Sequence, residues 1–374
     1  MTLRNLSVQN FKCFASLELP LNDLTLLTGV NSAGKSSAVQ ALLALRQSAD
    51  QGLLLRGRLA LNGDLVTLGT AKDALFQDAE DEVITLGLHD SEGRKASWAF
   101  RYESDRDVLA AAATEYSPAH SPELFGVGWF VYLSAERIGP RTSYARSDFA
   151  VRERRQLGRM GEYALDYLAR FADHKVADGL RHPKAVSAQL KDQVEAWTGE
   201  ITPGTRIHVR ADPSMDAVKL RYSFELGNEV TDEFRATNVG FGLSYTLPVL
   251  VALLGASPGD ILVIENPEAH LHPRGQAQMG RMLALAAAAG IQVIIETHSD
   301  HVLNGVRLAV ASKEIEPEQV AVHFFAREQA DGAWGAPYLV SPTIDGDGRI
   351  DRWPEGFFDE WDKALDRLLA GRVP

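Results

Sequence analysis

The chain has 374 residues, 45% of them hydrophobic and 24% charged, and its 38 basic and 50 acidic side chains give a net charge of −12. This composition excludes a disordered or fibrous chain, and no aliphatic stretch approaches the about 20 residues that span a bilayer. The single cysteine, Cys13, excludes an internal disulfide, so we expect a cytoplasmic protein without a membrane segment. Because the overall charge repels polyanions, any nucleic-acid site must be a local patch.

The first 50 residues predict a strand, a glycine-rich loop and a helix. Short apolar segments predict strands at residues 3–8, 16–19 and 24–28, and an amphipathic pattern predicts a helix from residue 35 to about 48. The sequence between the third strand and this helix is GVNSAGKS, at residues 29–36. It fits the P-loop pattern, and its strand and helix flanks are the context that such a loop requires.

A P-loop surrounds nucleotide phosphates with backbone N–H groups at a helix N-terminus. Gly29 and Gly34 allow the tight turn, Lys35 bridges the β- and γ-phosphates, and the Ser36 hydroxyl binds Mg²⁺. The predicted nucleotide-binding residues of the loop are Gly29, Asn31, Ser32, Gly34, Lys35, Ser36 and Ser37.

The middle of the chain, from about residue 53 to 236, has a different pattern. The predicted elements are strands at 82–88, 96–102, 129–133 and 218–226, and helices near 161–172 and 184–197. Seven arginines and only two acids lie between residues 137 and 159. This segment is either a solvated arm or a phosphate-binding patch, and the sequence leaves both open.

The last third returns to an α/β pattern. Aliphatic runs predict buried parallel strands at 261–264 and 291–295, and between them Pro273 opens a helix that ends at Gly290. Beyond residue 344, a glycine-rich turn precedes an amphipathic helix. Asp345 and Asp347 lie in that turn, where flanking glycines favour a turn over a metal site.

Four residues at the ends of these two strands are candidates for catalysis. Glu265 ends its strand, where a P-loop enzyme places the acid that holds Mg²⁺ through water. The next position usually carries the carboxylate that activates water, and here it is Asn266, an amide that accepts no proton. Glu268 is the nearest carboxylate that could replace it. His298, after the second strand, could donate to the γ-phosphate.

Two further patterns carry weaker signals. Gly240, Gly242 and Ser244 precede an apolar helix and predict a second anion-binding helix N-terminus, with Gly242 and Ser244 as candidate nucleotide contacts. A metal cluster is the competing interpretation of the histidines, although no cysteine assists it and a proline follows directly. Its members would be His270, His272, His298, His301 and Glu296.

The order of these motifs resembles an ABC-type ATPase head of the SMC, RecF and OLD branch. NFKCF after the first strand is similar to the NF(K/R)xF start of that branch, and ENPEAHLHP to its DEPExxLHP motif. YLSAERIGPR and WPEGFFDEW resemble segments of bacterial AAA-family ATPases. The resemblance covers about the first 50 residues and about 238–310 with good specificity.

The resemblance implies an α/β P-loop NTPase fold with an ABC-type head, a mixed central sheet flanked by helices and an inserted α+β lid. It implies the ligands ATP and Mg²⁺ and a homodimer with ATP between two heads, in which Ser244 contacts the γ-phosphate of the other subunit. The implied division is an N-terminal core at 1–52, an inserted lid at 53–236, a C-terminal core at 237–325 and a tail at 326–374. No Toprim nuclease domain is expected.

The implied function is an ATPase that acts on DNA or on a separately encoded effector, in genome maintenance or antiviral defence. Because Asn266 replaces the usual glutamate, a second hypothesis stays open: a nucleotide-sensing switch that hydrolyses little ATP and gates a separate nuclease or toxin. The sequence does not identify the glutamine that links the P-loop to the lid in this class, for which Gln77 is one candidate. A histidine-based metallohydrolase is the third hypothesis.

Overall fold

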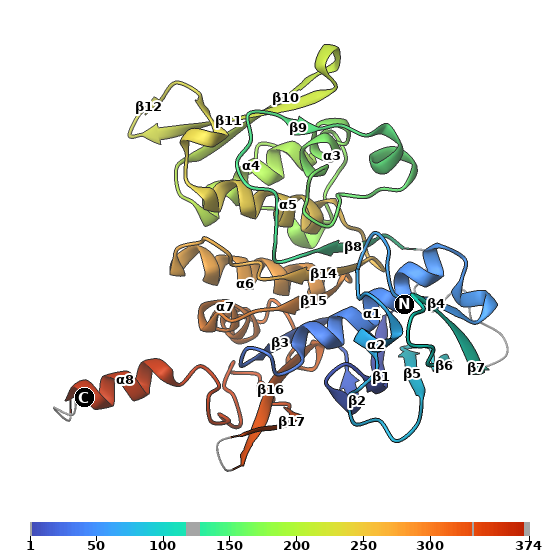
Figure 1. Cartoon of the computed structure of the whole chain (residues 1–374). Helices are drawn as coiled ribbons and strands as arrows, with labels where there is room; N and C mark the ends of the chain where they lie inside the picture. The colour runs from blue at the N-terminus through green and yellow to red at the C-terminus, as the bar shows by residue number, and fades with distance from the viewer. Residues whose placement is uncertain (1, 117–127, 331–332, 370–374) are drawn as a thin grey trace.

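The computed structural model describes residues 2–116, 128–330 and 333–369, which form three sheets (Figure 1). The central sheet has the strand order β17-β16-β3-β15-β14-β8. Its strands are β3 (Leu24–Gly29), β8 (Phe130–Leu133), β14 (Ile261–Glu265), β15 (Gln292–Glu296), β16 (Val320–Ala330) and β17 (Ala333–Val340). All neighbours pair in parallel except β16 and β17. The predicted mixed α/β sheet is confirmed.

Helices cover both faces of the central sheet (Figure 1). Helix α1 packs on one face, and α5, α6 and α7 pack on the other. The helices of the described residues are α1 (Lys35–Asp50), α2 (Ala71–Ala74), α3 (Ala164–Arg170), α4 (Leu190–Ile201), α5 (Phe241–Gly255), α6 (Pro273–Ala288), α7 (Asp300–Ala311) and α8 (Glu360–Leu369). Because side chains alternate along a strand, Ile261 and Val263 of β14 pack in the core that contains α1, and Leu262 and Ile264 pack in the core that contains α5, α6 and α7.

The predicted βαβ unit is β14, α6 and β15. Pro273 occupies the first turn of α6, and Gly290 follows the helix with a φ of 87°. The two strands pair in parallel with Glu265 opposite Glu296. The carboxyl ends of β3, β14 and β15 therefore lie at one edge of the sheet, where ligands bind in this class of fold.

A second sheet is antiparallel and has the order β2-β1-β5-β6-β7-β4. Its strands are β1 (Leu3–Phe11), β2 (Phe14–Pro20), β4 (Arg58–Ala60), β5 (Val83–Asp90), β6 (Lys95–Arg101) and β7 (Val108–Tyr116). The segment 53–236, expected as one inserted lid, is therefore shared among three sheets: β4–β7 pair with the N-terminal β1, and β8 is an edge strand of the central sheet. The sequence of a hairpin does not show which sheet its strands will join.

The third sheet packs with α3 and α4. Its strands are β9 (Tyr144–Ala145), β10 (Thr205–Asp212), β11 (Ala217–Leu226), β12 (Glu229–Val230) and β13 (Phe234–Arg235). Helix α4 begins at Leu190, six residues after the predicted start at 184. The Gln193 side chain holds the preceding segment in turns, because it accepts from His182 N–H and donates to the Ser187 carbonyl.

The C-terminal segment forms the predicted turn and helix. Asp345 Oδ1 accepts from the N–H groups of Asp347 and Arg349 and closes the turn. Helix α8 extends away from the central sheet in Figure 1. Within the described ranges, no helix combines the length and apolar character needed to cross a bilayer.

Candidate nucleotide site

The P-loop connects the end of β3 to the start of α1. Gly29 and Gly34 have φ values of 130° and 110°, which L side chains rarely adopt. A Cβ on Gly34 would lie 2.5 Å from the Phe14 ring, so both the conformation and the space require glycine. No side chain caps α1, so N–H groups of its first turn stay available to an anion. The loop fits a nucleoside triphosphate.

Lys35 is buried at the base of this loop. Its Nζ donates to the carbonyl oxygens of Gly29 and Val30, both at 2.9 Å, and lies 4.0 Å from a carboxylate oxygen of Glu296. Burial lowers the pKa of Lys35, and the charge of Glu296 opposes this effect. The ammonium is thus held beside the position that the phosphates of a P-loop ligand take.

A pocket of about 830 Å³ opens above the loop. Of the predicted loop residues, Asn31, Ser32, Gly34, Lys35, Ser36 and Ser37 line it. Gly29 does not, but it lines a smaller neighbouring pocket of about 170 Å³. His298 lines both pockets. The structure therefore brings most of the predicted binding residues to one cavity.

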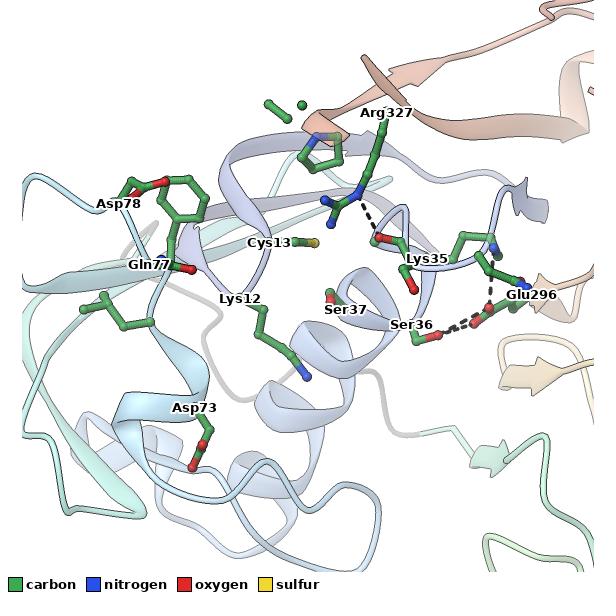
Figure 2. Close-up of a pocket in the computed structure, with 18 of the residues that line it drawn as sticks. Lys12, Cys13, Lys35, Ser36, Ser37, Asp73, Gln77, Asp78, Glu296 and Arg327 are labelled. Carbon is green, nitrogen blue, oxygen red and sulfur yellow. Dashed lines mark hydrogen bonds and ion pairs between the residues drawn. The ribbon is translucent and has the colours of Figure 1, made fainter. Parts of the chain in front are cut away.

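Glu296, at the end of β15, is the carboxylate that reaches this pocket. Its two carboxylate oxygens lie 3.1 and 3.3 Å from Ser36 Oγ, and the two side chains point toward each other in Figure 2. Burial and the charge of Glu265 raise the pKa of Glu296 to about 7, while Lys35 and Ser36 oppose the shift. The sequence interpretation included Glu296 only in the metal-cluster alternative. The sequence feature that could have identified Glu296 is its position as an acid at the end of an aliphatic strand, directly before Thr297.

The predicted catalytic residues Glu265, Asn266 and Glu268 are not among the described residues that line this pocket. Glu265 is held elsewhere, because its carboxylate accepts from Tyr132 Oη at 3.1 Å and from Ala135 N–H at 3.0 Å. Asn266 has a φ of 43°, a left-handed conformation that asparagine tolerates better than glutamate. The local backbone thus gives a physical reason for the amide at this position.

Glu268 connects this strand end to His298. Glu268 Oε1 accepts from the backbone N–H of His298 at 3.1 Å, and burial raises the pKa of Glu268. Burial and the charge of Lys35 lower the pKa of His298, so its exposed imidazole is neutral at pH 7. His298 thus meets the pocket with a neutral ring, which keeps one N–H that can donate a hydrogen bond.

Arg137 has a structural role that the sequence did not show. It lies in the arginine-rich segment but is only 2% exposed. Its guanidinium donates to the carbonyl oxygens of Ser134, Glu265 and Asn266, with Nη1 2.7 Å from that of Glu265. Arg137 therefore fixes the turn that follows β14.

The rest of the arginine-rich segment is largely paired with acids or aromatic rings. The contacts are Arg146 with Asp166 at 3.1 Å, Arg152 with Asp148 at 3.5 Å, Arg154 with Asp64 at 3.7 Å, and Arg155 over the Trp129 ring at 4.9 Å. Pairing of this kind reduces the charge available to a polyanion. DNA binding by this segment stays a prediction.

The Ser244 side chain, predicted to contact the γ-phosphate of a second subunit, is buried in this structure. Ser244 lies in the first turn of α5, is 4% exposed, and faces the phenols of Tyr144 and Tyr222. At the same helix start, Phe241 is 59% exposed, and a Cβ on Gly242 would lie 2.6 Å from the His270 carbonyl. Ser244 is therefore packed against the core, whereas Phe241, at the first position of the helix, lies at the surface.

Two further segments form walls of the pocket. From the N-terminal side, Gln77 and Asp78 lie across the cavity from Glu296 (Figure 2). From the C-terminal side, Arg327 of β16 donates from Nε to the carbonyl of Ser32 at 2.9 Å. The sequence offered Gln77 as a candidate, but it carried no signal for Arg327.

No group of three or more His, Cys, Asp or Glu side chains in the described part of the chain is arranged to hold a metal ion. This holds for the histidines near His298 and for the turn at Asp345. A Mg²⁺ ion bound together with a nucleotide needs fewer protein ligands, because phosphate oxygens and water complete its octahedral shell. The Ser36 hydroxyl and the nearby carboxylates are oxygen donors of the kind that this ion prefers.

Comparisons with known proteins agree with this geometry. Residues 24–304 match the AAA_21 family, described as "AAA domain, putative AbiEii toxin, Type IV TA system", and residues 315–368 match "Protein of unknown function (DUF3696)". No curated protein matches the chain.

Three solved structures of SMC heads are similar. One bound to the C-winged helix domain of ScpA has 11% identity and a TM-score of 0.50, covering 92% of this chain and 98% of that one. The Thermotoga maritima head has 12% identity, coverage of 91% and 98%, and a TM-score of 0.47. The head with the ScpA C-terminal domain derived from Pyrococcus furiosus has 12% identity, full coverage of both chains, and a TM-score of 0.49. The chain belongs to the AAA_21 family of AAA-domain ATPases, and its fold is that of an SMC-like, ABC-type P-loop ATPase.

Proposed function

We propose that the protein binds Mg²⁺-ATP in the pocket above the P-loop and hydrolyses it. The observation that carries this proposal is the convergence of Lys35, Ser36, Glu296 and His298 on one cavity of about 830 Å³. Lys35 would contact the β- and γ-phosphates, and the neutral ring of His298 would donate to the γ-phosphate. Mg²⁺ would be held by the Ser36 hydroxyl and by a carboxylate at these strand ends, for which the sequence predicts Glu265 acting through water, and would supply charge neutralisation.

The other predicted P-loop residues would bind the phosphates through their main chain. Backbone N–H groups of Asn31, Ser32 and Ser37 would bind phosphate oxygens, since loops of this kind act through the main chain. Asn266 or Glu268 would position the attacking water. Glu268 would do so only after moving, because its carboxylate is buried and holds the His298 N–H.

We further propose that two heads dimerise with ATP between them. The exposed start of α5 supports this idea, because Gly240 and Phe241 present an accessible helix N-terminus next to the turn after β14. The contact to the partner's nucleotide would come from main-chain N–H groups near Gly242, since the Ser244 side chain is buried. Nucleotide in the interface would couple binding to dimerisation.

The dimer would act on DNA or on a separately encoded effector, in genome maintenance or in defence against phage. The family description, which names a toxin of a type IV TA system, supports the defence reading. In this proposal, 1–52 and 237–325 supply most of the ATPase core. The inserted segment 53–236 adds β8 to the central sheet of that core, and the C-terminal segment 326–374 adds the end of β16 and β17.

A second function is favoured by a specific observation. Glu265 accepts hydrogen bonds from Tyr132 and Ala135, Glu268 is buried and accepts from the His298 N–H, and Asn266 takes the place of the usual base. None of these three described side chains is therefore an exposed, unpaired carboxylate that could activate water. The alternative is an ATP-sensing switch that hydrolyses little ATP and gates a separate nuclease or toxin.

Phosphate release from Mg²⁺-ATP distinguishes the two functions. The purified protein is measured with and without duplex DNA, and Lys35→Ala supplies the background. Turnover above that background supports the ATPase, and stimulation by DNA supports DNA as a ligand. Binding of ATP without turnover supports the switch, and absence of ATP binding contradicts both.

A further inference from the structure

The end of β15 places a carboxylate against the hydroxyl of the P-loop. Glu296 is 9% exposed, and its oxygens lie 3.1 and 3.3 Å from Ser36 Oγ and 4.0 Å from Lys35 Nζ (Figure 2). β15 is hydrogen-bonded to β3, the strand that leads into the P-loop. The main chain of both strands therefore fixes this contact.

Glu265 lies beside Glu296 on the next strand but is turned to other partners. Its two oxygens are bonded by the Tyr132 hydroxyl and the Ala135 N–H, and it does not line the pocket. Of the two neighbouring acids, the one that faces Ser36 is therefore Glu296.

We propose that Glu296 is the protein carboxylate of the Mg²⁺ site, acting together with Ser36; this inference rests on the proposed function. A P-loop serine is a Mg²⁺ ligand, and a carboxylate hydrogen-bonded to that hydroxyl is within reach of the ion it holds. Mg²⁺ takes one or two carboxylates and completes its shell with water and phosphate oxygens.

Charge supports the same conclusion. A carboxylate beside bound phosphates repels them, and the effect is large where burial lowers the effective dielectric. Lys35 is the cation 4.0 Å away, and it already donates to two loop carbonyls. A divalent cation between Glu296 and the phosphates converts this repulsion into attraction. Glu296 should therefore weaken binding of metal-free ATP and strengthen binding of Mg²⁺-ATP.

A purely structural role for Glu296 predicts a different outcome. In that case the side chain only accepts the Ser36 hydrogen bond, which the amide oxygen of glutamine also accepts. Glu296→Gln keeps the shape and that hydrogen bond and removes the charge. Only the metal role predicts a change that depends on Mg²⁺.

The test is calorimetric titration of the full chain with the non-hydrolysable analogue AMP-PNP, once in EDTA and once in excess Mg²⁺. The variants are Glu296→Gln and, as the matched control on the neighbouring strand, Glu265→Gln. For Glu296→Gln we expect affinity in EDTA equal to or higher than wild type. We expect the increase in AMP-PNP affinity on adding Mg²⁺ to be smaller than in wild type by at least about tenfold. This is the size of effect seen when a group that tunes a metal ligand is removed. Glu265→Gln should lose less of that gain.

The outcomes separate this inference from the function on which it rests. An intact Mg²⁺ gain in Glu296→Gln overturns the inference, as does an equal loss of affinity with and without Mg²⁺, which marks structural damage. If Glu296→Gln keeps the gain in AMP-PNP affinity from Mg²⁺ and Glu265→Gln loses it, the ion is assigned to Glu265 instead. If the wild type binds no nucleotide under either condition, the proposed function itself fails.

Discussion

Replacing Glu296 by Gln is expected to stabilise the nucleotide-free protein, and increasingly so as the pH rises. Burial and the charge of Glu265 raise the pKa of Glu296 from 4.5 to about 7. The folded state then binds a proton more tightly than the unfolded state. The stability that this group contributes is complete below pH 4.5 and is lost as the pH rises through about 7.

The size of the effect follows from the shift. One pKa unit corresponds to about 1.4 kcal/mol, so the full shift amounts to about 3 kcal/mol, most of it between about pH 5 and about pH 8. Glutamine does not titrate. The free energy of unfolding of Glu296→Gln relative to wild type should therefore increase by about 2 to 3 kcal/mol across this range.

Urea unfolding in EDTA without nucleotide, followed by tryptophan fluorescence across this pH range, measures the difference. Glu229→Gln, on exposed β12, is the control and should differ from wild type by less than about 0.5 kcal/mol at every pH. A Glu296→Gln difference that stays constant with pH, or that shrinks as the pH rises, refutes the reasoning.

Three further substitutions test other contacts. Arg137→Ala should lower the free energy of unfolding by about 3 kcal/mol, because three backbone carbonyls lose a buried charged donor. Arg152→Ala, whose ion pair is exposed, is the control and should lower it by less than about 1 kcal/mol. Equal losses of stability for the two variants in urea unfolding would contradict this prediction. Arg327→Ala releases the Ser32 carbonyl and should weaken AMP-PNP binding by about tenfold, or about 1.4 kcal/mol, in calorimetry; an unchanged Kd would show that Arg327 is not needed. Phe241→Ala should weaken ATP-dependent dimerisation, as light scattering would show, and leave the ATP affinity of the monomer unchanged, as calorimetry at protein concentrations too low for dimers would show. A full dimer argues against α5 as the interface.

The sequence predicted the P-loop and four strands of the central sheet, β3, β8, β14 and β15, for physical reasons, but it gave no prediction for β16 and β17. Buried parallel strands such as β14 and β15 are continuous aliphatic runs, and Pro273 and Gly290 mark the ends of the helix between them. The glycines of the loop are required by backbone conformation, which is a local property. Features of this kind depend only on residues within one segment, so the sequence of that segment is enough to predict them.

The parts that the sequence did not predict depend on contacts between distant segments. Glu296 meets Ser36, and Arg137 meets the turn after β14, across separations of more than 120 residues. Which acid faces the pocket is set by strand order and by partners such as Tyr132, neither of which the sequence displays. Similarly, only the packed helix shows that Ser244 turns inward.

The measurement that tests the central claim most directly is the molar mass of the protein by light scattering, with and without Mg²⁺-ATP, for wild type and for Lys35→Ala. We expect the wild type to double its mass when ATP is added and Lys35→Ala to remain at the mass of the ATP-free protein, with an unchanged fold by circular dichroism. A Lys35→Ala protein that dimerises with ATP, or a wild type whose mass does not respond although ATP binds, would contradict the nucleotide sandwich.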